Sequence, residues 1–68
     1  MQPPDTLKAI SSISQGKLID CSAEQWPEIR KAVQEQAGKW IDYGDGFRAT
    51  IALQEVARLD KKFSGSAP

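Results

Sequence analysis

Residues 22–42 read SAEQWPEIRKAVQEQAGKWID, and this stretch decides the fold class. Its apolar residues recur at spacings of three and four, so they fall on one stripe of an α-helix. The opposite face carries acidic and basic residues at the i,i+3 and i,i+4 spacings of ion pairs. We therefore predict one long amphipathic helix over residues 22–42. Its apolar stripe consists of Trp26, Ile29, Val33, Ala37, Trp40 and Ile41.

The expected beginning of this helix carries two signals that conflict. Ser22 and Gln25 have the spacing of a capping box, in which each side chain accepts a hydrogen bond from the other residue's backbone N–H. Pro27 would then fall just past the first turn, where its missing N–H and its ring disturb the helix. We expect a start that is kinked or displaced towards Trp26.

The segment 47–63 has two interpretations. As a helix, it presents an apolar stripe and is rich in good helix formers, with Gly44 ending the previous helix and Asp45 capping this one. As a strand, residues 47–53 alternate after an Asp-Gly turn, which would make a hairpin around residues 39–52. The helical pattern continues through residues 54–62, where no alternation exists, so we favour the helix. Its expected stripe is Ala49, Ala52, Leu53, Val56, Leu59 and Phe63.

The resulting prediction is an all-α, three-helix domain with helices over residues 5–15, 22–42 and 46–63. The last two would form a central antiparallel helical hairpin, and the alternative is an α+β fold with the short β-hairpin. We expect a single domain with ragged ends at residues 1–4 and 64–68. The predicted core consists of Trp26, Ile29, Val33, Trp40, Leu53, Val56, Leu59 and Phe63, closed by Leu7, Ile10, Ile13 and Leu18.

Composition narrows the expected function classes. The 68 residues include nine basic and nine acidic residues, one cysteine and no histidine. One thiol makes neither an internal disulfide nor a zinc site, and no residue pattern indicates catalysis, so we expect no metal, no cofactor, no small-molecule substrate and no enzymatic activity. No apolar run is long enough to span a bilayer, and the predicted compartment is cytoplasmic. A chain this short commonly needs added support, so we expect a protein partner or a homo-oligomer.

Two apolar residues remain outside the helical stripe and are candidates for partner binding. Phe47 and Ile51 lie one turn apart on the side of the last helix away from the expected core. They either pack beneath Tyr43 and the first helix or form, with Tyr43, a surface that docks a partner or another copy of the chain.

A nucleic-acid partner is the alternative expectation, although the net charge of zero lacks the usual electrostatic signature. Four basic residues on the last helix would carry the binding. They are Arg48, Arg58, Lys61 and Lys62. The competing interpretation is that the cations near the end of this helix complement its dipole.

Residues 42–63, DYGDGFRATIALQEVARLDKKF, resemble helical hairpins of small terminase subunits, the DNA-recognition components of phage packaging motors. The resemblance implies a phage-derived helical protein and the nucleic-acid alternative. Our leading hypothesis is a non-catalytic protein-interaction or assembly module that binds a larger protein or self-associates. The positions that match the hairpin pattern are Arg48, Ala52, Leu53, Leu59 and Phe63.

Overall fold

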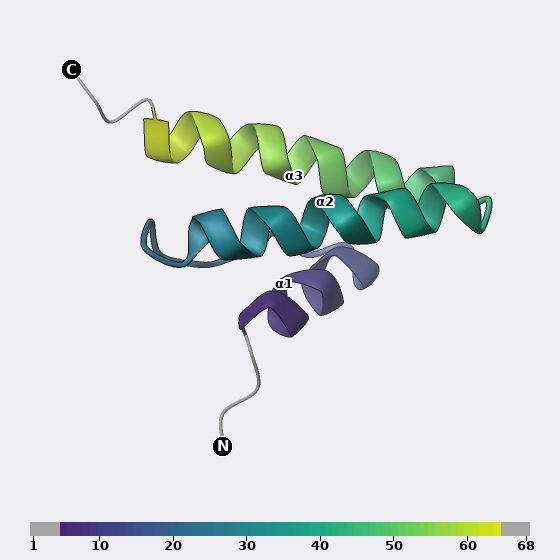
Figure 1. Cartoon of the computed structure of the whole chain (residues 1–68), viewed down its shortest axis with the longest axis horizontal. Coiled ribbons are helices and arrows are strands. Elements are labelled where there is room, and N and C mark those ends of the chain that lie inside the picture. Colours follow the sequence, from purple (N-terminus) through teal and green to yellow (C-terminus); the bar gives the residue numbers. More distant parts are fainter. Residues whose placement is uncertain (1–4, 65–68) are drawn as a thin grey trace.

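The structure, a computed structural model that describes residues 5–64, consists of three α-helices (Figure 1). These are α1 (Asp5–Ser14), α2 (Trp26–Asp42) and α3 (Gly46–Ser64). No strand occurs within residues 5–64, so the all-α prediction is confirmed and the α+β alternative is wrong. Of the ends expected to be ragged, Ser64 is the last residue of α3, and residues 1–4 and 65–68 lie outside the described residues.

The predicted antiparallel hairpin is the centre of the fold. α2 and α3 run side by side and make the most extensive contact between helices (Figure 1). α1 packs mainly on α2 and less on α3, and the connector over residues 15–25 crosses behind α2 to reach its first residue (Figure 1). One end of the hairpin therefore holds the α2–α3 turn, and the opposite end holds the start of α2 and the end of α3.

The turn between α2 and α3 has a defined backbone geometry. Gly44 adopts φ of 81°, a left-handed conformation that glycine takes without the steric cost of a Cβ. Its N–H donates to the Ile41 carbonyl at 3.0 Å, and the Asp45 N–H donates to the Trp40 carbonyl at 2.7 Å. This pair of bonds is a Schellman motif, which satisfies carbonyls left open at a helix end. α1 ends in the same way at Gly16.

The start of α2 shows how the conflict between Ser22 and Pro27 is resolved. Ser22 and Gln25 exchange the two capping-box hydrogen bonds, each 3.4 Å long, but residues 23–25 form only a turn. The helix begins at Trp26, four residues after the predicted bound at residue 22, so the expected displacement of its start is confirmed. Pro27 then occupies the first turn of α2, where a helix needs no backbone N–H donor.

The core differs from the predicted one at its edges. Leu53 is 48% exposed, because α3 turns Ala49 and Ala52 towards its neighbours and leaves Leu53 on the flank. Leu7 and Leu18 are also exposed, contrary to prediction, and Ile19 enters the core in place of Leu18. The buried apolar residues are Ala9, Ile13, Ile19, Trp26, Ile29, Val33, Ala37, Trp40, Ala49, Ala52, Val56 and Leu59, with Ile10, Cys21, Ile51 and Phe63 partly buried against them.

Candidate protein-interaction surface

Side-chain hydrogen bonds add to the backbone hydrogen bonds that hold the α2–α3 turn. Asp45 caps α3, as predicted, because its Oδ1 accepts the Arg48 backbone N–H at 3.1 Å. The Arg48 guanidinium donates to Oδ2 of the same carboxylate at 2.6 Å. These hydrogen bonds from Arg48 lower the pKa of Asp45 below its ordinary value of 3.8. The Asp45 carboxylate therefore stays charged and completes the turn begun by the Schellman motif.

Large apolar side chains stand in solvent at this turn. Tyr43 is 82% exposed and Phe47 is 79% exposed, whereas Ile51 is only partly exposed and packs against the core. The interpretation that Phe47 packs beneath Tyr43 is therefore wrong, and Ile51 belongs to the core margin. Ile41, the last apolar residue of the predicted α2 stripe, is also exposed, at 57%. We call Ile41, Tyr43 and Phe47 the tip surface.

The four basic residues proposed for nucleic acid differ in their surroundings. Arg48 is bonded to Asp45, and Arg58 is bonded to a carboxylate and to a backbone carbonyl within the fold. Lys61 and Lys62 are exposed in the last turn of α3, and the Lys62 ammonium lies 5.6 Å from the centre of the Phe63 ring. Both arginines therefore have structural roles, and the two lysines occupy the end of α3, where cations complement the helix dipole.

Glu55 is a buried charged residue with a structural role that the sequence pattern does not indicate. It is 5% exposed, and its Oε1 accepts the backbone N–H of Ile19 at 2.8 Å. Arg58 donates to both Glu55 oxygens and also to the Ile19 carbonyl at 3.0 Å. The hydrogen bonds from Arg58 hold the pKa of Glu55 below its ordinary 4.5 despite its burial. Glu55 and Arg58 together fasten the connector to α3, and we call them the connector clamp.

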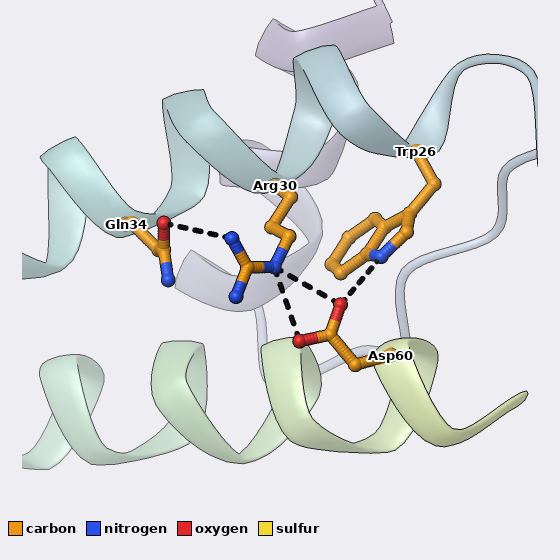
Figure 2. Close-up of polar contacts among 4 residues, drawn as sticks. All are labelled: Trp26, Arg30, Gln34 and Asp60. Carbon is orange, nitrogen blue, oxygen red and sulfur yellow. Dashed lines mark hydrogen bonds and ion pairs between the residues drawn. The ribbon is translucent and has the colours of Figure 1, made fainter. Parts of the chain in front are cut away.

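At the end of the hairpin opposite the α2–α3 turn, the carboxylate of Asp60 links α3 to α2 (Figure 2). Asp60 of α3 accepts the indole N–H of Trp26 at 2.8 Å, and both its oxygens accept the Arg30 Nε–H at 3.0 Å. These bonds, that of Trp26 foremost, lower the pKa of Asp60. Figure 2 shows the Trp26 and Arg30 side chains reaching from α2 to Asp60. This cluster ties the start of α2 to the end of α3.

Within residues 5–64, an open hollow of about 380 Å³ lies between α1 and the connector. It is lined by Lys8, Ala9, Ser11, Ser12, Gln15, Lys17 and Asp20. Within residues 5–64, no three His, Cys, Asp or Glu side chains are grouped so as to hold a metal ion. No helix in this part of the chain has the length and apolar character to cross a membrane.

Comparison with known proteins adds no family to this description. The chain matches no protein-family model, and no curated protein or solved structure matches it significantly. The interpretation of the tip surface therefore rests on its geometry and chemistry.

Proposed function

We propose that this chain is a non-catalytic protein-interaction or assembly module that binds another protein through the tip surface. The observation that carries the proposal is the exposure of Tyr43 and Phe47 on a turn whose backbone is fixed. Aromatic side chains contribute large contact areas at low conformational cost and are enriched at the energetic centres of interfaces. Two of the five aromatic residues of the chain are thus available to a partner.

The rigidity of the turn supports this role. Binding costs less free energy when the contact residues are already ordered. The Schellman motif at Gly44 and the cap formed by Asp45 with Arg48 order the backbone that carries both aromatic rings. A partner would thus meet a preformed surface.

The charged groups of the fold support a non-catalytic role. General acid–base catalysis works best when the pKa of the catalytic group lies near the working pH. The pKa values of Asp45, Glu55 and Asp60 are instead all lowered by donors within the fold. At neutral pH these carboxylates act as hydrogen-bond acceptors that hold helices together.

The proposal is tested by replacing Phe47 with a photo-crosslinking amino acid in cells that naturally make the protein. We expect a covalent adduct of defined mass after illumination. The control places the same crosslinker at Glu35, an exposed position of α2, and should give no such adduct. Absence of any adduct from position 47, or equal adducts from both positions, would contradict the proposal.

A further inference from the structure

We infer that α1 and residues 15–21 form a strap that opens from the α2–α3 hairpin as one unit, with the connector clamp as its latch. Opening lifts the strap off the apolar core and leaves the two long helices packed together. This motion lies outside the proposed function, because the hydrogen bonds that order the turn of the tip surface join residues within 39–49.

The α2–α3 hairpin has a core and polar contacts of its own. Of the twelve buried apolar residues in the described chain, nine lie on α2 or α3, and the strap contributes Ala9, Ile13 and Ile19. The two long helices also make the most extensive contact between helices. The cluster around Asp60 joins them at one end and includes no residue of the strap (Figure 2). The hairpin therefore keeps most of its contacts when the strap leaves.

The strap cannot keep its own structure once it leaves the hairpin. α1 has ten residues, fewer than an isolated helix needs to be stable in water. Ser11, Ser12 and Ser14 lower its helix propensity further. The Lys17 N–H donates to the Ser12 carbonyl at 2.7 Å, so the residues after α1 are bonded to its last turn. We therefore expect α1 and residues 15–21 to detach and unwind together.

The connector clamp binds both backbone polar groups of Ile19. The Ile19 N–H donates to Glu55 Oε1 at 2.8 Å, and the Ile19 carbonyl accepts a hydrogen bond from Arg58 at 3.0 Å. Glu55 and Arg58 lie one turn apart on α3, where they also bond to each other at 2.8 and 2.9 Å. Their ion pair stays on α3 when Ile19 departs. Opening therefore breaks the latch without leaving a buried charge unpaired, which is the costly outcome for a buried ion pair.

The strap is tested by native-state amide hydrogen exchange of the full chain, measured by NMR. The Ile19 amide and the slowest amides of α1 should exchange through one common opening, so their protection factors should agree. These protection factors should be at least about tenfold lower than those of the slowest amides of α2 and α3, which exchange only when the hairpin itself unfolds.

Two variants separate the strap from the hairpin. Gly38→Ala, on α2 with open space around it, strengthens a helix that is present in both the closed and the open chain. It should slow exchange of the slowest α2 and α3 amides about two- to fivefold and leave Ile19 unchanged. Glu55→Gln weakens a latch that is present only in the closed chain. It should speed exchange of Ile19 and of the slowest α2 and α3 amides by one common factor, about five- to thirtyfold.

Three results would overturn the strap. The first is equal protection of Ile19 and of the slowest α2 and α3 amides in the wild-type chain. The second is a Gly38→Ala variant that slows exchange at Ile19 as much as in α2. Either result means that the whole chain opens at once. The third is a Glu55→Gln variant with unchanged exchange at Ile19, which means that the connector clamp is not the latch.

Discussion

Removal of the Glu55 carboxylate should destabilise the fold more than any other single change of a charged residue. Glu55→Ala leaves the Ile19 backbone N–H, now bonded to Oε1 at 2.8 Å, without its acceptor in a buried position. It also leaves the Arg58 guanidinium without the carboxylate to which it donates two hydrogen bonds. The connector would then lose the α3 side-chain acceptor that binds the Ile19 N–H.

The magnitude follows from these two losses. An orphaned buried donor costs about 1–3 kcal/mol. The Arg58 side chain is 37% exposed, so solvent compensates much of its lost ion pair, which adds at most about 1 kcal/mol. We expect Glu55→Ala to lower the free energy of unfolding by about 2–3 kcal/mol. Domains of this length are stable by roughly 3–10 kcal/mol, so the variant should lose a large share of its stability.

The assay is urea unfolding followed by circular dichroism. Glu55→Gln keeps an oxygen for the Ile19 N–H but loses the charge that attracts Arg58, so its loss should be intermediate, about 1–2 kcal/mol. Glu35→Ala, at an exposed position of α2, should change stability by no more than about 0.5 kcal/mol. If Glu55→Ala falls within that same range, the connector clamp does not hold the fold together.

Three further predictions test other parts of the structure. The pKa of Glu55 is lower in the folded chain than in the unfolded chain, so the contribution of Glu55 to the free energy of unfolding should be fully present above about pH 5 and should be lost as the pH falls through 4.5 and below. Urea midpoints measured against pH should show this loss, and Glu55→Gln should show a shallower one. Gly44→Ala places a Cβ at φ of 81° and should cost about 1 kcal/mol, whereas Gly38→Ala, inside α2 with open space around it, should stabilise by about 0.5–1 kcal/mol; thermal melting of the two variants should therefore shift in opposite directions. Leu59→Ala should lower the free energy of unfolding by about 2–5 kcal/mol because Leu59 is fully buried; Leu53→Ala should cost far less, and equal losses would show that Leu53 is buried as deeply as Leu59.

The helices and the turn between α2 and α3 were predictable because their causes are local. The apolar stripe of residues 22–42 fixes the buried face of α2, and the Gly44–Asp45 pair encodes the end of one helix and the cap of the next. The length of the helical pattern over residues 47–63 correctly favoured helix over strand. These features depend on spacings within one or two turns, which a single sequence displays directly.

The errors concern contacts between segments far apart in the chain. Leu53 and Ala52 are neighbours on α3, and only the way α2 and α1 pack decides which one is buried. The same holds for Leu18 and Ile19 in the connector. Glu55 stands three residues after Ala52 and four before Leu59, beside the buried stripe of α3, but its role depends on a backbone N–H that is 36 residues earlier. No periodicity in the sequence indicates that contact.

At the tip surface the sequence named Tyr43, Phe47 and Ile51 as candidates and left both a packed and an exposed arrangement open. All three are apolar residues near the turn, and periodicity alone left their exposure open. In the structure Ile51 packs against the core, whereas Phe47 is 79% exposed. Ile41 was missed because it continues the apolar stripe of α2.

The central claim, that this chain meets another protein at the tip surface, is tested most directly by backbone amide NMR spectra of the isotope-labelled chain. The spectra would be recorded with and without the purified protein that is captured by crosslinking at position 47. The account predicts shifts confined to residues 41–51, with the amides of α1 and of residues 57–64 unchanged. Shifts centred on α1, on the connector or on the end of α3, or no shifts anywhere, would contradict it.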